Sequence, residues 1–528
     1  MKIQSMLMVR ISWAFALLIL LLSWPLPAQA TPTPEVWYQV MLYAGTREAR
    51  SALVAHGFMP ESVDLDRGVV VLYVSQEELL HLRREGWAII DIRSLTFAPW
   101  DAGYHDYEEM RALLFSLAAQ YPDILAVQEY GRSVEGRALY VAKISDRVWE
   151  DESATEPGVL LFANIHAREH LSAEQALWTI QHLVRNYGKD PAVTNLVSQR
   201  EIWVMPMTNP DGVEYDIARY PYRYWRKNRR PNPDGSYGVD LNRNFGYRWG
   251  CCGGSSGQPF TDTYRGPAPF SEPETDAIRS FLQKHPSVRV SLNFHAFGEL
   301  VLWPYGYTYV SLPSDMDPVD YEVLVRAGKK MAQLSGYRAM QASDLYIADG
   351  TSDDWLYGAL GIPSWTVELY PPLSAGYNGF YPPDEVIPRE TERNRQMIEY
   401  LIALADEPRK ILGEVGDVIT PTVQLSLSGP SAERGLITAT LTISDDVGVT
   451  LVAVRAGDQP LRLRVLDPPI TQGTVTLPLL LPPGRSVLTA EAYDRAHNRG
   501  RSTPLTVDVT EAARNMWTPL VQISTAGR

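Results

Sequence analysis

The spacing of apolar and polar positions separates the chain after residue 30 into three regions of different character. In residues 31–96, runs with strand-like alternation are interleaved with two segments whose apolar residues recur every three to four positions. These periods are typical of half-buried strands and amphipathic helices, so we predict a small α+β domain that forms an open sandwich. Its strands are predicted at Val36–Tyr43, Val69–Val74 and Ala88–Ile92, with another near Ser62–Asp66, and its helices at Thr46–His56 and Gln76–Glu85.

The long middle region, residues 97–405, alternates short continuous apolar runs with helical periods. Continuous apolar runs are typical of strands buried on both faces, so we predict an α/β domain with a mixed sheet and helices on both faces. Ser271-Glu-Pro-Glu274 has the pattern of a capping box at a helix start. The strands are predicted at Ala138–Ile144, Val159–Ile165, Ile202–Met207, Val288–Phe294 and Ser364–Leu369, and the helices at Leu171–Tyr187, Glu274–Lys284 and Tyr321–Ser335.

Helical periodicity stops after Ile411, and residues 415–528 contain only short β-rich runs. Turn signals separate them at Ser428-Gly-Pro430, Asp445-Asp446 and Pro483-Gly484. Such spacing favours an immunoglobulin-like β-sandwich, which we expect to be an accessory domain. Its strands are predicted at Thr422–Leu427, Leu436–Ile443, Thr450–Arg455, Gly473–Leu480, Val487–Tyr493 and Leu505–Val509.

Residues 1–30 have the pattern of a signal peptide. Lys2 and Arg10 precede the apolar run Ile11–Leu22, and Ala28-Gln-Ala30 resembles a cleavage site. The alternative is a membrane anchor, but the run is shorter than the roughly 20 residues that a spanning helix needs, and prolines follow it. We therefore expect a secreted protein without a transmembrane segment.

The charge and the cysteine content of the chain exclude further classes of function. The net charge of −14 argues against nucleic-acid binding, which requires a basic surface. The chain has two cysteines, and they are adjacent, at Cys251 and Cys252. Two such residues are too few for a structural zinc site, whereas a disulfide between neighbours is feasible. The sequence leaves their redox state open.

Candidate metal ligands follow predicted strands. His166-Ala-Arg-Glu169 comes directly after an apolar run, and His295 and Glu368 end two others. Sites in open α/β sheets assemble beyond the carboxyl ends of strands, and two histidines with one carboxylate form a common catalytic zinc set. His166 to His170 also matches the H-x-x-E-H pattern, which places both histidines on one helix. That reading is disfavoured because His166 precedes the predicted helix.

The chain resembles the zinc metallocarboxypeptidases of the pancreatic carboxypeptidase A and B type, and resembles a secreted bacterial carboxypeptidase T still more. Because the matching blocks occur in order through most of residues 100–400, coincidence is excluded; residues 31–96 and the C-terminal region lie outside them. The blocks are Asn164-Ile-His-Ala-Arg-Glu-His170, Asn209-Pro-Asp-Gly212, Trp225-Arg-Lys227, Asp240-Leu-Asn-Arg-Asn244, Trp249-Gly-Cys-Cys-Gly-Gly254, His295, Trp303-Pro-Tyr-Gly306, Tyr346, Asp354-Trp355 and Thr366-Val-Glu368.

The resemblance implies a role for each matching residue. One Zn²⁺ per chain would be bound by His166, Glu169 and His295, with Glu368 as the general base. Arg226 would stabilise the oxyanion, and Asp240 would orient the first zinc histidine. Asn242 and Arg243 would bind the terminal carboxylate of a peptide substrate, Tyr346 would close over it, and Arg168 would help to position it. Phe297 stands where the pancreatic enzymes have tyrosine.

Specificity is expected to depend on Asp353, which matches the aspartate of the B-type pocket, and on the nearby acid Asp349. A carboxylate at the pocket floor favours terminal Lys or Arg, with some tolerance for apolar residues. From its position, the segment 31–96 is interpreted as an inhibitory or folding-assisting prosegment that is cut near Arg93. Calcium binding and the oligomeric state are not readable from the sequence.

Two other functions were weighed. A peptidase acting on peptidoglycan peptides could use the same scaffold, but Asn242, Arg243 and Tyr346 supply a complete clamp for an α-carboxylate. In an adhesion protein, the C-terminal sandwich would carry the binding site, but its sequence contains no recognisable ligand-binding motif. A carboxypeptidase acting on peptides or proteins with a free C-terminus is therefore the main prediction.

Overall fold

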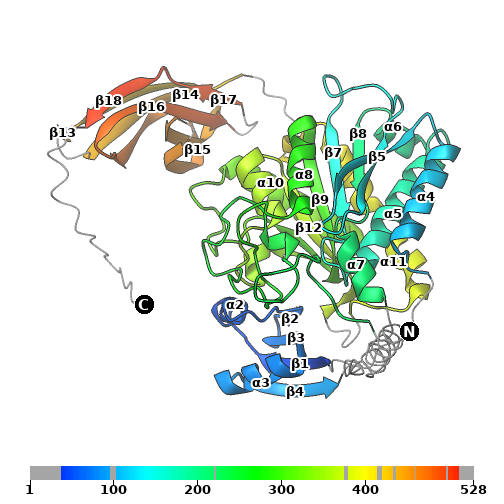
Figure 1. The fold of residues 1–528 in the computed structure, drawn as a ribbon. Coiled ribbons are helices and arrows are strands. Elements are labelled where there is room, and N and C mark those ends of the chain that lie inside the picture. The colour runs from blue at the N-terminus through cyan, green and yellow to red at the C-terminus, as the bar shows by residue number, and fades with distance from the viewer. Residues whose placement is uncertain are drawn as a thin grey trace, which may run out of the picture.

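The computed structural model describes residues 37–94, 103–218, 222–373, 379–412, 419–431, 436–457, 459–494 and 498–509. The predicted signal peptide lies outside these residues. Figure 1 shows three domains in chain order: an N-terminal domain (37–94), a central domain (103–412) and a C-terminal domain (419–509). Within the described residues, no helix is both long and apolar enough to cross a membrane.

The N-terminal domain is a four-stranded antiparallel sheet with two helices, as the periodicity predicts. Thr46 caps the first helix, and Ser75 forms a capping box with Glu78 at the second. The strand order is β2-β3-β1-β4. The elements are β1 (Trp37–Tyr43), α2 (Arg47–Ala55), β2 (Ser62–Asp64), β3 (Val69–Ser75), α3 (Gln76–Glu85) and β4 (Ile89–Ser94).

The central domain is built on an eight-stranded mixed sheet with the order β11-β10-β12-β9-β7-β8-β6-β5. In its middle, β9 pairs in parallel with β7 and β12. The pairs β10–β12, β6–β8 and β5–β6 are antiparallel, whereas the edge pair β10–β11 is parallel. All five predicted strands are confirmed. The strands are β5 (Leu125–Arg132), β6 (Ala138–Ile144), β7 (Gly158–Ala163), β8 (Glu201–Met205), β9 (Val288–Gly298), β10 (Leu300–Trp303), β11 (Arg338–Gln341) and β12 (Ser364–Pro372).

Helices cover both faces of this sheet because its central strands are apolar on both sides. In β7, Val159 and Leu161 belong to one buried cluster, whereas Leu160 and Phe162 belong to a second cluster on the opposite face. Successive side chains of a strand point to opposite faces, so each face requires its own cover. Figure 1 shows α5, α4 and α11 on one side and α8 and α10 on the other.

Three central helices were predicted, and the structure adds several. Its helices are α4 (Tyr107–Gln120), α5 (His170–Asn186), α6 (Pro191–Val197), α7 (Pro210–Ile217), α8 (Pro273–Lys284), α9 (Pro318–Ser335), α10 (Ser352–Leu360), α11 (Ile387–Arg393) and α12 (Arg395–Leu404). The capping-box prediction is wrong: Glu272 is the N-cap of α8 and makes no side-chain cap bond. The Ser271 hydroxyl bonds to the carboxylate of Glu272 instead, so it does not reach the helix amides.

The C-terminal domain is one six-stranded sheet that encloses a single apolar core. Asp445-Asp446 does not end a strand as predicted, because β14 continues through it with a shift of register between Ser444 and Val449. Likewise, Ser428-Gly-Pro430 lies inside β13. The long strands β14 and β15 thereby pair with each other along most of their length. The strands are β13 (Thr422–Ser431), β14 (Leu436–Ala456), β15 (Gln459–Leu480), β16 (Gly484–Asp494), β17 (Arg499–Arg501) and β18 (Leu505–Val509).

Candidate metal and substrate site

Three buried side chains converge at the end of β7 and within β9. His166 and Glu169 lie in the loop between β7 and α5, where the side-chain amide of Asn164 donates to the carbonyls of His166 and Ala167. Nδ1 of His166 lies 2.7 Å from the Glu169 carboxylate, Nδ1 of His295 lies 2.8 Å from it, and the two Nδ1 atoms are 3.1 Å apart. Two imidazole nitrogens and one carboxylate facing a common point form a zinc ligand set that leaves a fourth position free.

Electrostatics favour an ionised carboxylate in this group. Burial raises the pKa of Glu169, but His166 and His295 outweigh that effect, and the pKa lies well below its ordinary value. An ionised carboxylate and neutral imidazoles are the states that coordinate metal. The residues present therefore fit zinc, as the resemblance implies.

Asp240 is the buried carboxylate behind His166. Its Oδ1 lies 3.1 Å from Nε2 of His166, and its Oδ2 accepts two hydrogen bonds from Arg226, at 3.1 and 3.0 Å. A carboxylate on the far nitrogen of a metal-binding histidine fixes the orientation of the ring. Asp240 thus links the metal group to Arg226, whose Nη1 lies 3.9 Å from Glu169.

His170 is excluded from the metal group. It is the first residue of α5, and its Nε2 bonds to Asp216 at 2.9 Å, whereas His166 precedes the helix. The H-x-x-E-H alternative requires both histidines on one helix, so the structure rules it out.

His295 and Glu368 lie inside their strands rather than at the ends, because β9 continues to Gly298 and β12 to Pro372. The two residues are register partners in the parallel pair β9–β12. Burial, reinforced by the charge of Glu169, raises the pKa of Glu368 well above its ordinary value, while Arg226 opposes the rise. A carboxylate whose pKa is shifted toward neutrality is suited to accept and return a proton.

A cavity of about 80 Å³ joins these groups to most of the residues predicted to bind substrate. Asn242 and Arg243 enter it from the short 3₁₀ turn η1 (Leu241–Arg243), Asp353 enters from the first turn of α10, and Phe297 and Tyr346 also line it. Burial raises the pKa of Asp353, and it raises that of Tyr346 to about 12.

The N-terminal domain also contributes to the cavity, through Met59, Pro60, Glu61 and Val63. Sequence reasoning did not identify these four residues, because no local pattern marks a segment that enters the site of another domain. Only their contacts with the central domain reveal them.

Two predicted substrate residues lie outside the cavity lining. Asp349 faces the loop that contains the disulfide, where it accepts bonds from Gly250, Cys252 and Gly254. Arg168 is buried behind the site, where it donates to the carbonyl of Tyr224 and pairs with Asp262 and with Glu61 of the N-terminal domain. In the full chain neither residue lines the cavity, although Arg168 adjoins it through its pair with Glu61, which does.

A second group of carboxylates lies elsewhere in the central domain. Asp146, Glu152 and Glu156 each offer an oxygen atom within 4.8 Å of the others. Arg147 forms an ion pair with Glu152 at 2.5 Å, and burial raises the pKa of Glu156 to about 7. Because Arg147 already neutralises part of the group, we assign no ion to it, and calcium binding remains untested.

The central domain is similar in sequence to proteins of known function. The sequence profile of the zinc carboxypeptidase family matches residues 110–397, more than half of the chain. The chain is 41% identical over 320 residues to a zinc carboxypeptidase of Saccharothrix mutabilis subsp. capreolus, covering 59% of this chain and 71% of that protein. It is 36% identical to mouse carboxypeptidase A2, covering 55% of this chain and 67% of that protein.

A solved structure agrees with this assignment. Carboxypeptidase A from Helicoverpa armigera superposes with a TM-score of 0.58 at 25% identity, covering 70% of this chain and 97% of that one. The matched region contains the group of His166, Glu169 and His295. The chain therefore belongs to the zinc carboxypeptidase family, and it is a zinc-dependent hydrolase of peptides.

Proposed function

We propose that this enzyme is exported as an inactive precursor and, once its N-terminal domain has been cut away, removes C-terminal Lys or Arg from peptides. The observation that carries the proposal is the cavity itself, which brings together the zinc group, Glu368, the cationic Arg243 and the acidic Asp353. The zinc group, Glu368 and Arg243 account for hydrolysis of the bond next to a terminal carboxylate. Asp353 accounts for the preference for a basic side chain.

Each residue has a distinct part in the proposed reaction. Zinc, when bound, supplies a Lewis acid and lowers the pKa of water. Glu368 accepts a proton from the attacking water and returns it to the leaving amine. Arg226, fixed by Asp240, stabilises negative charge on the carbonyl oxygen, because a preorganised cation needs no reorientation during the reaction. Asn242 and Arg243 bind the α-carboxylate, and Tyr346 closes over the terminal residue.

The preference for basic residues rests on Asp353. Its side chain is buried in the cavity lining, and its pKa is raised by burial. A buried carboxylate without a cation is costly, so a Lys or Arg side chain that enters the pocket relieves that cost and gains a charge-assisted hydrogen bond. Apolar residues gain neither, although they still fill the cavity.

Inhibition by the N-terminal domain is supported by what it contacts. Glu61 forms a buried ion pair with Arg168, and the sulfur of Met59 lies 3.8 Å from Nη2 of Arg243. The domain also holds the segment that carries Tyr346: Arg50 donates to the carbonyl of Asp344 at 2.8 Å, and Ser51 accepts from the amide of Ile347 at 2.8 Å. It therefore occupies the carboxylate site and restrains the residue that would close over substrate.

Export is inferred from the first 30 residues, whose charge, apolar run and small-residue motif are typical of a signal peptide. Measuring the N-terminus of the protein recovered from the medium of an expressing cell tests it. A retained Met1, or a protein found only inside cells, would contradict export.

A panel of N-blocked dipeptides ending in Arg, Lys, Leu or Phe, each as free acid and as amide, tests the rest. We expect zinc-dependent cleavage of the free acids alone, abolished by a chelator and restored by zinc.

Substrates ending in Arg or Lys should be preferred over those ending in Leu or Phe by roughly 10- to 100-fold in kcat/KM. This ratio corresponds to a charge-assisted hydrogen bond with Asp353 of about 1.5–3 kcal/mol. Asp353→Ala should remove the preference, and Glu368→Gln should lower kcat by roughly 10²–10⁴ while retaining zinc. Cleavage of the amides would overturn the assignment of a carboxypeptidase. A preference for Phe that Asp353→Ala leaves unchanged would overturn the proposed preference for basic residues.

A further inference from the structure

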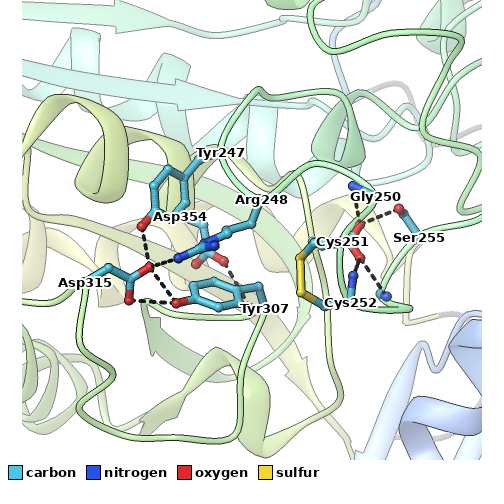
Figure 2. Close-up of a disulfide and its surroundings, with 11 residues drawn as sticks. Tyr247, Arg248, Gly250, Cys251, Cys252, Ser255, Tyr307, Asp315 and Asp354 are labelled. Atoms are coloured by element: carbon cyan, nitrogen blue, oxygen red, sulfur yellow. Dashed lines mark hydrogen bonds and ion pairs between the residues drawn. A yellow bond between two sulfur atoms is a disulfide. The ribbon is translucent and has the colours of Figure 1, made fainter. Parts of the chain in front are cut away.

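The loop Gly250–Ser255, here called the disulfide loop, is anchored more firmly than its exposed position suggests. Its outer tip is closed by the disulfide between the exposed residues Cys251 and Cys252. Its inner end is buried at Gly254 and Ser255. Figure 2 shows the disulfide with Gly250, Cys252 and Ser255 around one carboxylate.

That carboxylate belongs to Asp349, which is fully buried. It accepts from the amides of Gly250 at 3.2 Å, Cys252 at 3.0 Å and Gly254 at 2.9 Å, and from the hydroxyl of Ser255. Hydrogen bonds to an ionised acceptor are about twice as strong as neutral ones. One side chain therefore fixes the loop at four positions.

The disulfide loop in turn contacts Arg243. The carbonyl of Gly254 accepts a hydrogen bond of 3.0 Å from Nε of Arg243. Gly254 packs so closely against the backbone of Ala348 and Asp349 that a Cβ added to it would meet Cα of Ala348 at 2.5 Å and the amide nitrogen of Asp349 at 2.6 Å. Its amide is bonded to Asp349 and its carbonyl to Arg243, so Gly254 connects the two side chains.

Fixing Nε fixes the rest of the guanidinium, since the group is planar and its donors form a rigid fork. Nη1 bonds to the carbonyl of Asn242 at 2.7 Å, which leaves Nη2 directed at Met59 of the N-terminal domain. We infer that Asp349 and the disulfide loop are the element that positions Arg243 for the α-carboxylate of the substrate. Asp349 is a positioning residue, which acts through the loop and touches no substrate.

This inference rests on the carboxylate-binding role proposed for Arg243. It differs from the role of Asp353, which selects the side chain. Disturbing Asp349 weakens the binding of every free-acid substrate equally, whatever its terminal side chain. Because the carboxylate is held alike in the ground and transition states, the loss falls on KM rather than on kcat.

The chain offers a matched control in Asp315, which Figure 2 shows separated from the disulfide by Arg248 and Tyr307. Its carboxylate accepts from the hydroxyls of Tyr247 and Tyr307 at 2.7 Å and from Arg248 at 2.6 Å. Among the described residues, its side chain bonds to neither Arg243 nor a residue of the disulfide loop. Asp315→Asn therefore removes a comparable set of side-chain bonds while leaving every bond between Asp349 and the disulfide loop in place.

The test compares Asp349→Asn with Asp315→Asn and with Arg243→Lys, each in the full chain after identical limited proteolysis. For an N-blocked dipeptide ending in Arg, Asp349→Asn should raise KM about 5- to 20-fold while kcat changes less than 2-fold. Inhibition by free arginine should weaken by the same factor, whereas inhibition by argininamide, which has no carboxylate, should not change. Asp315→Asn should change each constant less than 2-fold, and the ratio of Arg to Leu substrates should stay constant throughout.

If Asp349→Asn does not fold, variants that remove fewer bonds from the disulfide loop can still test the inference. Ser255→Ala, and the double change Cys251→Ser with Cys252→Ser, should shift KM in the same direction by about 2- to 5-fold with zinc content unchanged. Equal effects of Asp349→Asn and Asp315→Asn, or equal weakening of arginine and argininamide, would overturn the inference. A normal KM in Arg243→Lys would instead refute the proposed carboxylate site.

Discussion

Two small domains flank the central domain, and they differ in which part of it they contact (Figure 1). The N-terminal domain contributes four residues to the lining of the active-site cavity. The described part of the C-terminal domain contributes none. It packs instead through Leu451 and Tyr493 against Val319 of α9 and Leu412. The contact surface, rather than the presence of an accessory domain, therefore decides which one can regulate catalysis.

The two contacts also differ in chemistry. The N-terminal contact includes a buried ion pair between Glu61 and Arg168, with side chains 4% and 0% exposed. The C-terminal contact is a small apolar cluster. Near its Tyr493, Arg409 pairs with Asp320 at 2.8 Å and is 38% exposed, and both of these residues belong to the central domain. Breaking a buried pair costs several times more than breaking a partly exposed one. Changes at the first contact should therefore alter activity, and changes at the second should alter little beyond stability.

Cutting the chain between residues 94 and 103 should produce the largest difference between the two domains. We expect kcat/KM on a small N-blocked dipeptide to rise at least 100-fold, because Met59 leaves the carboxylate site and the segment carrying Tyr346 is released. Activity before and after limited proteolysis, with the fragments identified by mass, measures this rise. Equal activity of the intact and cut protein would contradict inhibition, although a role in folding would remain.

Weakening the N-terminal contact without a cut should have an intermediate effect. Glu61→Gln leaves the buried Arg168 without its main carboxylate partner, so the domain should open more often and the activity of the uncut chain should rise about 10-fold. Glu77→Gln, at an exposed position on α3, is the matched control and should change nothing. No gain in Glu61→Gln would mean that the ion pair does not hold the domain closed.

Removing the C-terminal domain should have a much smaller effect on activity. A chain that ends at Leu412 should keep kcat/KM within about 2-fold after the N-terminal cut. Its melting temperature should fall by a few degrees, since Val319 becomes exposed. If the shortened protein folds and binds zinc but loses most of its activity, the C-terminal domain also affects catalysis, and the contrast between the two flanking domains is wrong.

The smallest expected change is in Arg409→Gln. Losing its pair with Asp320 should reduce the free energy of unfolding by about 0.5–1 kcal/mol at neutral pH, with no change in kcat/KM. Burial raises the pKa of Asp320 even though Arg409 opposes the rise. Asp320 is neutral below that pKa and then needs no cation, so the difference between variant and wild type should shrink as the pH falls. Urea unfolding at neutral and acidic pH measures this, and a pH-independent difference would contradict it.

Much of the fold was predictable because burial leaves a periodic pattern in the sequence. The helix Gln76–Glu85 and the strands Ala138–Ile144 and Leu505–Val509 were predicted with their observed bounds. Short strands such as β10 and β11 were missed, because four residues carry too little periodicity. The predicted turn at Asp445-Asp446 failed for a different reason. A polar pair favours a turn locally, and Asp445 does accept a hydrogen bond from the amide of Gly448, but β14 continues on both sides and its pairing with β15 resumes at Val449.

The sequence by itself determined the family, and it was enough to predict the zinc ligands and the general base, because these residues occur in short blocks that can be recognised without a structure. Only the tertiary structure decided that His295 and Glu368 face each other across β9 and β12, and that Asp353 lines the cavity whereas Asp349 does not. It alone placed Met59 and Glu61 in the site of another domain. These relations depend on strand register and on contacts between distant segments, which no local pattern of residues encodes.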